Sequence, residues 1–127
     1  MNAYHSVGVV THLSYIIGFP FDTVESVKKD VDRLVSLGSG QTSFFMMTPL
    51  PGAMDFKSVI ERKMIRDADL NNYDTFHETH RHARMNPGKW LESYEDAWRK
   101  FYSVENMKKI LRNIGREPYW GVFFNFI

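Results

Sequence analysis

The sequence contains no cysteine among its 127 residues. This absence excludes disulfide bonds, thiolate nucleophiles, zinc–thiolate sites and iron–sulfur clusters held by cysteines of this chain. An excess of one charge is also lacking, because 16 basic and 15 acidic residues leave a formal net charge of +1. That balance gives no electrostatic signature for nucleic acid or an anionic membrane. We therefore expect neither as a partner.

Long apolar runs and targeting signals are missing as well. Segment 1–19 lacks the basic region and uninterrupted apolar core of a signal peptide. Polar residues such as His5 and His12 interrupt any stretch long enough to span a bilayer. The chain does contain 43% hydrophobic and 15% aromatic residues, enough to bury the core of one ordinary domain. We expect a soluble, cytoplasmic protein.

The first half of the sequence predicts two buried strands. The apolar runs Val7–Val10 and Leu13–Ile17 precede Gly18 and Pro20, a pattern that favours a strand ending in a turn. Gln41–Thr48 forms a second run of this kind. Because these runs show little polar alternation, we expect parallel strands that are covered on both faces.

A helix is predicted between the two strands. Asp22 or Thr23 can accept hydrogen bonds from the free amides of its first turn, and Gly38 ends it. Its apolar stripe consists of Val24, Val27, Val31, Leu34 and Val35. A strand, a helix and a strand of these lengths form a right-handed crossover with parallel strands.

The second half is predicted to be mainly helical. A short helix at Asp55–Met64 and a polar loop at Arg66–Asp74 come first. Pro87 is expected in the first helical turn, where its missing amide hydrogen costs nothing. The following helix carries Trp90, Tyr94, Ala97, Trp98 and Phe101 on one face, which is typical of core packing.

A last helix and an aromatic end follow. Ser103 is predicted to cap the helix, and Gly115 to stop it. Tyr119–Ile127 is strongly aromatic, and an exposed end of this composition favours aggregation. We therefore expect further chain or a partner to cover it.

Three histidines suggest a metal site that their spacing does not support. Imidazole with carboxylate suits zinc or non-haem iron, and His77, His80 and His82 lie close to Asp74 and Glu78. On a helix only His77 and His80 would share a face, and on a strand only His80 and His82. We therefore assign no metal ligands and no catalytic residues.

Four motifs in a fixed order resemble the radical S-adenosylmethionine superfamily. They are YIIGFPFDT at Tyr15–Thr23, then TPLPGA, NNYDTFH and YEDAWRKFYS. The resemblance covers residues 7–112 and is strongest to the branch in which a cobalamin-binding domain precedes the radical domain. It implies that the chain corresponds to the carboxy-terminal fragment of that domain, a partial (β/α) barrel.

The resemblance implies where each part of the chain would lie. Residues 1–66 would be the end of the barrel, with Val9–Phe19 and Gln41–Thr48 as its fifth and sixth strands. Residues 67–127 would be a helical extension packed on it, so that the chain is one structural unit. The residues implied to contact S-adenosylmethionine are Ile16, Ile17, Gly18, Phe19, Pro20, Thr48, Pro49 and Leu50.

The resemblance is incomplete in ways that limit the implied activity. Phe21 replaces an acid and Ala53 a small hydroxyl residue of the family pattern. The cysteines that hold a four-iron cluster, and the cobalamin domain, have no counterpart here. We expect the chain alone to be inactive in radical modification or methylation, and a missing amino-terminal barrel portion to be its partner. A two-stranded remnant would leave both sheet edges unpaired. The alternative is a non-catalytic α/β binding module or the partner subunit of a split enzyme.

Overall fold

The computed structural model describes residues 2–114, 116–124 and 126. The mixed α/β class predicted from the sequence is confirmed, and none of the described helices is long and apolar enough to cross a membrane. The elements are, in chain order, α1 (Asn2–His5), β1 (His12–Ile17), α2 (Val24–Leu37), β2 (Gln41–Met46), α3 (Met54–Glu61), the 3-10 turn η1 (Leu70–Asn72), α4 (Lys89–Phe101), α5 (Val104–Asn113) and α6 (Arg116–Phe124).

The two strands pair in parallel, as predicted, and their register runs from His12↔Gln41 to Ile17↔Met46. The expected strand over Val7–Val10 is wrong. That segment leaves α1 through a turn in which Gly8 has a φ of +78°, a conformation incompatible with an extended strand. The first strand therefore begins only at His12.

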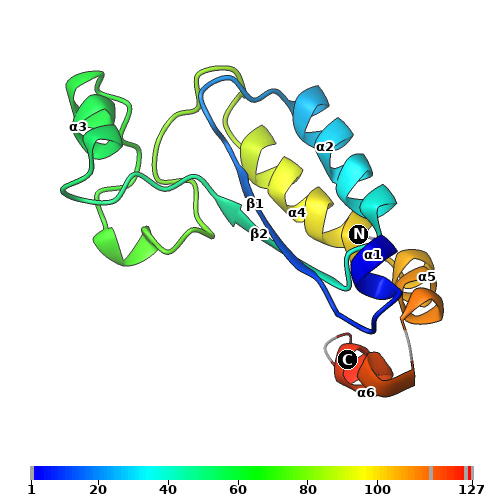
Figure 1. Ribbon diagram of the computed structural model, residues 1–127. Coiled ribbons are helices and arrows are strands. Elements are labelled where there is room, and N and C mark those ends of the chain that lie inside the picture. Colours follow the sequence, from blue (N-terminus) through cyan, green and yellow to red (C-terminus); the bar gives the residue numbers. More distant parts are fainter. Residues whose placement is uncertain (1, 115, 125, 127) are drawn as a thin grey trace.

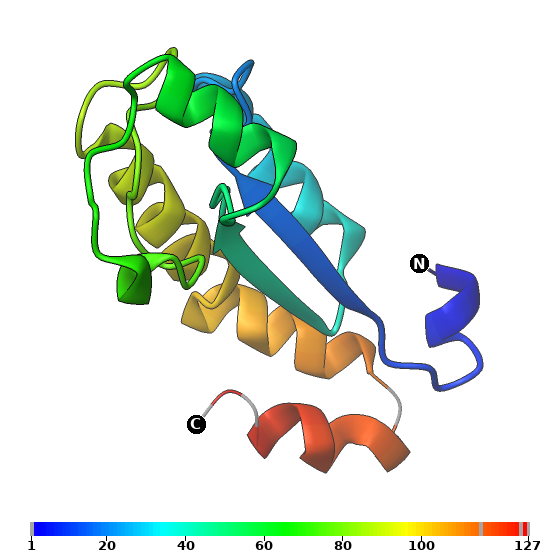
Figure 2. The ribbon, with the colours of Figure 1, turned by 90° about the vertical axis from the view of Figure 1, so that its left-hand side faces the viewer.

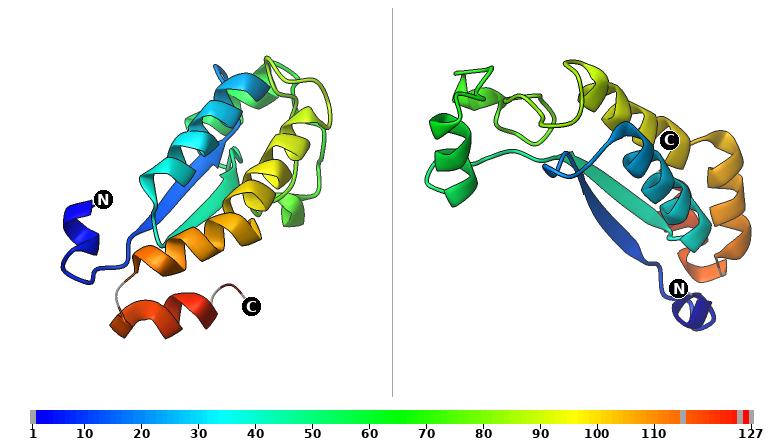
Figure 3. Two further views of the ribbon diagram at one scale, coloured as in Figure 1. Left: turned by 90° about the vertical axis from the view of Figure 1, so that its right-hand side faces the viewer. Right: turned by 90° about the horizontal axis from the view of Figure 1, so that it is seen from above.

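Helices cover one face of the sheet and leave the other open. α2 and α4 lie side by side over the covered face (Figures 1 and 3), whereas Figure 2 looks onto the open face. Burial alternates along both strands, so that Ile17 is fully buried while its neighbour Ile16 is 43% exposed. The expectation of strands covered on both faces is therefore wrong for this chain.

The core lies between the covered face and the helices. Phe44 of β2 is fully buried. Its ring packs edge-on against those of Trp98 and Phe101, with ring centroids 5.4 and 6.1 Å apart. Burying a side chain of this size stabilises the fold by about 1.5–3 kcal/mol. The cluster also contains Ile17, Val27, Val31, Met46, Met85, Trp90, Ala97, Ile110 and Val122. The aromatic stripe of α4 is thus a packing face, as predicted.

The helix caps agree with the sequence prediction at α2 and α5 but not at α4. Thr23 caps α2 in a reciprocal pair with Ser26, and Gly38 ends that helix with a φ of +66°. Ser103 caps α5 as expected. Pro87, by contrast, lies before α4, whose N-cap is Gly88 with a φ of +81°. The predicted stop at Gly115 lies outside the described residues.

The two ends of the sheet carry different segments. α3 and the polar loop lie beyond the carboxyl ends of the strands, and α6 lies near the opposite end (Figure 1). Val122 of α6 is buried in the core, whereas Trp120 and Phe124 of the same helix are 62% and 65% exposed. The aromatic end is therefore only partly covered by the chain itself.

Candidate functional site

The turn that follows β1 is built around one buried carboxylate. Asp22 Oδ2 accepts hydrogen bonds from the backbone amides of Gly18 and Phe19, both at 2.9 Å. The Asp22 amide in turn donates to the Phe19 carbonyl at 2.8 Å. Charge-assisted bonds to backbone amides are stronger than neutral ones. Asp22 therefore shapes the turn and does not cap α2, a role that Thr23 performs.

Gly18 is fixed by the close approach of Trp90. The indole Nε1 donates to the Ile17 carbonyl at 3.0 Å, and a Cβ on Gly18 would overlap the indole ring. Gly18 also has a φ of +110°, which residues other than glycine rarely adopt. Trp90 of α4 consequently fills the side of the turn that faces the helices. Only the side that faces away from α4 is available to a ligand.

One histidine, His82, holds the loop before α4 against this turn. His82 Nε2 donates to the Phe19 carbonyl at 2.9 Å, while its Nδ1 accepts from the amides of Arg84 and Met85 at 3.0 Å each. These partners require the neutral tautomer with the proton on Nε2. The ring of His82 lies 5.5 Å from that of Trp90. His82 is therefore a structural bridge between the two segments.

His80 is buried beside the same tryptophan, with ring centroids 5.0 Å apart. Burial lowers the pKa of His80 and His82 lowers it further, whereas Glu78 acts in the opposite direction. His77 lies elsewhere, paired with Asp74 at 2.9 Å on the surface. No group of three potential metal ligands occurs among the described residues.

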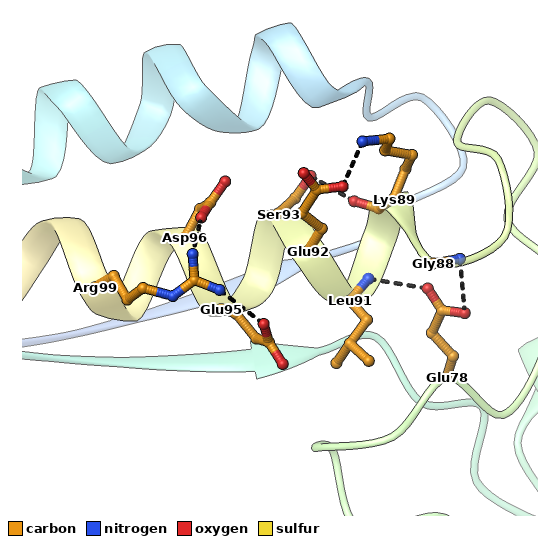
Figure 4. Close-up of polar contacts among 9 residues, drawn as sticks. All are labelled: Glu78, Gly88, Lys89, Leu91, Glu92, Ser93, Glu95, Asp96 and Arg99. Atoms are coloured by element: carbon orange, nitrogen blue, oxygen red, sulfur yellow. Dashed lines mark hydrogen bonds and ion pairs between the residues drawn. The ribbon is translucent and has the colours of Figure 1, made fainter.

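Glu78 caps the start of α4 from outside the helix. Its Oε1 accepts from the Leu91 amide at 2.9 Å, and its Oε2 from the Gly88 amide at 3.4 Å (Figure 4). Arg66 pairs with the same carboxylate at 3.2 Å. An acid at a helix N-terminus also interacts favourably with the helix dipole. Sequence reasoning missed this residue, because a capping side chain ten positions before the N-cap residue Gly88 leaves no local signal.

The open face of the sheet presents a small set of side chains. His12 contacts Gln41 Oε1 at 3.3 Å and the Ser43 hydroxyl at 3.1 Å. Ile16 follows on the same face nearer the turn, beside Phe45 in the strand register. The two isoleucines implied to bind the cofactor thus point to opposite faces, and only Ile16 is accessible to a ligand.

The remaining predicted site residues differ in accessibility. Phe19 and Pro20 are exposed at the turn, and Phe19 stacks on Phe21 at 5.6 Å. After β2, Pro49 is fully buried while Leu50 is 54% exposed. Parallel pairing places both segments at the same end of the sheet.

Two hollows flank the turn. A cavity of about 80 Å³ between Gly18, Met47 and His80 is not lined by Thr48, Pro49 or Leu50. A larger cleft of about 490 Å³ lies toward α4, between the arginines Arg66, Arg81 and Arg84 and residues that include His80, His82 and Trp90. Arg66 is bound to Glu78, and Arg84 to the Phe21 carbonyl at 3.3 Å. His82 and Arg84 thus hold the turn in place through the Phe19 and Phe21 carbonyls.

Comparison with known proteins gives a distant similarity to a methyltransferase. No family model matches the chain. The bacteriochlorophyllide d C-12(1)-methyltransferase of Chlorobaculum tepidum is 26% identical over 113 residues, which are 89% of this chain but 24% of that enzyme. The chain therefore spans about a quarter of the length of the relative that it matches.

Proposed function

We propose that this chain forms one wall of the S-adenosylmethionine site in a methyltransferase of the radical, cobalamin-dependent type. The observation that carries this proposal is the open face of the β1–β2 sheet. Ile16 is exposed there directly before the turn held by Asp22 and Trp90, within a segment distantly similar to a methyltransferase. In a barrel, helices cover the outside of the strands, so the open face would line the interior.

The residues present fit part of the cofactor set. An exposed isoleucine beside a rigid turn suits contact with the flat, partly apolar face of an adenine ring. When bound, S-adenosylmethionine would supply the group that is transferred. The chain has no cysteine, so it has no thiolates for a four-iron cluster, and we assign it no residue toward cobalamin. Both groups would be held by the segment that completes the barrel.

The residues around the turn would position Ile16 for contact with the ligand. Asp22, Trp90 and His82 fix the turn from three directions, through bonds of 2.9, 3.0 and 2.9 Å. A wall that is rigid before the ligand arrives loses little conformational freedom on binding. This rigidity would hold Ile16 in register with the reactive groups on the other segment.

A binding measurement tests the proposal. This chain is co-expressed with the part of the C. tepidum methyltransferase that lies outside the matched region, and S-adenosylmethionine binding is measured under anaerobic conditions. Ile16→Asp should weaken binding about tenfold or more, because a carboxylate is costly to bury against an apolar ring. Ile60→Asp on α3 is the matched control, since Ile60 is similarly exposed at 50%. Equal binding by both variants would contradict the proposal.

The chain alone gives a second test. Anaerobic reconstitution with iron and sulfide should incorporate no four-iron cluster, because the chain offers no thiolate ligand. Stable cluster formation together with reductive cleavage of S-adenosylmethionine by the chain alone would refute the proposal that another segment holds the cluster. If the co-expressed complex neither binds nor cleaves S-adenosylmethionine, the non-catalytic alternative is favoured instead.

A further inference from the structure

The cleft beside the start of α4 carries an excess of positive charge. Its charged lining consists of three arginines, Arg66, Arg81 and Arg84, and one acid, Glu78. The whole chain, by contrast, has a formal net charge of only +1. Positive charge is therefore concentrated at this cleft, and a concave site lined by charge of one sign attracts ligands of the opposite sign.

The three arginines differ in the partners of their side chains. Arg66 pairs with Glu78 at 3.2 Å, and Arg84 donates to a backbone carbonyl of the turn at 3.3 Å. The Arg81 guanidinium has no hydrogen-bond or ion-pair partner within the part of the chain that the structure describes. Its backbone is nevertheless held, because the Arg81 amide donates to the Met64 carbonyl at 2.8 Å. Arg81 thus offers a planar fork of donors, the geometry that matches a carboxylate.

His80 is a second group of this cleft without a partner. The residue is only 6% exposed, and its Nδ1 is buried with no hydrogen-bond partner among the described residues. Buried polar atoms of folded proteins nearly always have a partner. Burial lowers the pKa of His80, so that its ring is neutral near pH 7 and carries one N–H donor. A neutral imidazole of this kind is suited to bind a polar group of a ligand.

Glu78 makes a carboxylate a better ligand for this cleft than a phosphate. Its side chain already accepts from the Leu91 and Gly88 amides at the start of α4 (Figure 4). Amides in this position are the groups that commonly bind phosphate at a helix N-terminus. The negative charge of Glu78 also repels a dianion more strongly than a monoanion. The remaining donors, one guanidinium and one neutral imidazole, therefore suit a planar monoanion.

The rest of the cleft has room for an organic molecule. Its volume of about 490 Å³ lies in the range of small-molecule sites and is clearly larger than a carboxylate group needs. Ala83, Met85, Pro87 and Trp90 contribute apolar atoms to its lining. The ligand that fits is consequently an acid whose carboxylate is attached to a partly apolar body.

We propose that the cleft binds the carboxylate group of a small organic acid through Arg81 and His80. This acid is a second ligand, distinct from S-adenosylmethionine, because none of the turn residues 18–21 lines the cleft. His82 lines the cleft and also donates to the Phe19 carbonyl at 2.9 Å, so the cleft adjoins the turn. The binding site itself does not depend on the proposed function, whereas a role of the acid as acceptor of the methyl group rests on it.

Calorimetry on the chain alone tests the charge of the ligand. The probe is naphthoate, an aromatic carboxylate, and naphthamide is its uncharged analogue of similar shape. Naphthoate should bind at least about tenfold more tightly, because a charge-assisted hydrogen bond is stronger than a neutral one. Equal affinities, or no binding of naphthoate at about 10 mM, would overturn the proposal.

A pair of arginine variants tests the position of the site. Arg81→Gln changes an exposed side chain, so the variant should fold, and its affinity for naphthoate should fall at least about tenfold. Arg112→Gln in the last turn of α5 removes the same charge from another exposed position and should change the affinity less than about twofold. Equal losses in the two variants would reduce the effect to net charge and overturn the site.

Nuclear magnetic resonance on the unaltered chain tests the part of His80. Naphthoate should shift the ring-proton resonances of His80. Those of His77, which pairs with Asp74 on the surface at 2.9 Å, should stay unchanged. Unchanged His80 resonances at saturating naphthoate would overturn its assignment as a ligand-binding group.

Two competing ligands test the chemical class. Naphthyl phosphate should bind more weakly than naphthoate, and tighter binding of the phosphate would overturn the carboxylate assignment. S-adenosylmethionine, which has a carboxylate of its own, should not displace naphthoate. Displacement would assign Arg81 to S-adenosylmethionine and overturn the second ligand.

The same variants separate this site from the proposed function. Ile16→Asp should leave naphthoate binding by the chain intact. Arg81→Gln should leave S-adenosylmethionine binding by the co-expressed complex intact. Loss of naphthoate binding in Ile16→Asp, or of S-adenosylmethionine binding in Arg81→Gln, would overturn the separation of the two ligands. If the complex does not bind S-adenosylmethionine but the chain binds naphthoate through Arg81, the acid site stands and the proposed function is contradicted.

Discussion

Replacing Gly18 by alanine should strongly destabilise the protein. The new Cβ would overlap the Trp90 indole, and the φ of +110° is unfavourable for any residue with a side chain. Such a backbone conformation costs about 1–3 kcal/mol. Overpacking a tight site costs about 1–3 kcal/mol as well. Trp90 is pinned by its bond to the Ile17 carbonyl, so the ring has little freedom to move. We expect a loss of about 3 kcal/mol or more in the free energy of unfolding.

A second glycine separates the two causes. Gly38 also has a positive φ, +66°, but nothing lies within 4 Å of the Cβ that it would gain. Gly38→Ala should therefore cost about 1 kcal/mol, from the backbone alone. Urea unfolding followed by circular dichroism measures both variants. Equal losses for Gly18→Ala and Gly38→Ala would refute the close packing of Trp90 on the turn.

A double variant refines the same test. In a Trp90→Leu background the overlap with the indole disappears, so Gly18→Ala should then lose only the backbone contribution. The difference between the two backgrounds is the coupling energy of the pair, which we expect to exceed about 1 kcal/mol for residues in direct contact. Full additivity would show that the two positions do not interact.

Three further predictions concern the polar groups around the turn and α4. Glu78→Gln should reduce the free energy of unfolding by about 1–2 kcal/mol in urea titrations, because it weakens the external cap of α4. Asp22→Asn should cost about 1–2 kcal/mol by the same measurement, since one carboxylate oxygen accepts from two backbone amides, of which that of Gly18 is buried. Because the pKa of His80 is lowered in the folded state, the free energy of unfolding should be highest above the ordinary histidine pKa of about 6.5. Stability should then fall as the pH drops from that value toward the folded pKa, because only the unfolded state gains the proton readily.

Matched variants control these three expectations. Glu92→Gln on the exposed side of α4 removes only a surface pair with Lys89 and should cost less than about 0.5 kcal/mol. Asp55→Asn, on exposed α3, controls for the loss of a carboxylate and should be close to neutral. His80→Gln should flatten the fall in stability between pH 7 and pH 5. A dependence unchanged by that substitution would assign the effect to other groups.

Local signals in the sequence predicted the elements that depend on local chemistry. The sequence predicted a cap of α2 at Asp22 or Thr23, its terminal glycine, the parallel crossover and the packing face of α4, and the structure has Thr23 as the cap. Each of these left its signal within a single helix, a single strand or the turn that follows it. The predicted start of β1 is wrong, because the apolar residues of Val7–Val10 favour a strand whereas Gly8 between them adopts a positive φ.

Features that depend on distant partners could not be predicted in this way. Glu78 caps α4 across a loop, and Tyr102 bonds to Thr42 from 60 positions away. The open face of the sheet also carried too weak a signal, because Ile16 and Phe45 are apolar although β1 and β2 alternate in burial. Hydrophobicity alone could not distinguish a face that protein covers from one available to a ligand or to another chain.

The bond between Trp90 and Ile17 also sets the order in which this chain can fold. Their positions are 73 residues apart, and closing a loop of that size costs about 4 kcal/mol of chain entropy. At ordinary rates of synthesis, about 5–20 residues per second, the turn after β1 emerges roughly 4–15 s before the tryptophan that fills its inner side. The strand–helix–strand unit must therefore persist on the ribosome with that side empty. The turn can reach its final shape only when the start of α4 arrives, so a chain that stalls before Trp90 would expose the buried end of β1 to chaperones and proteases.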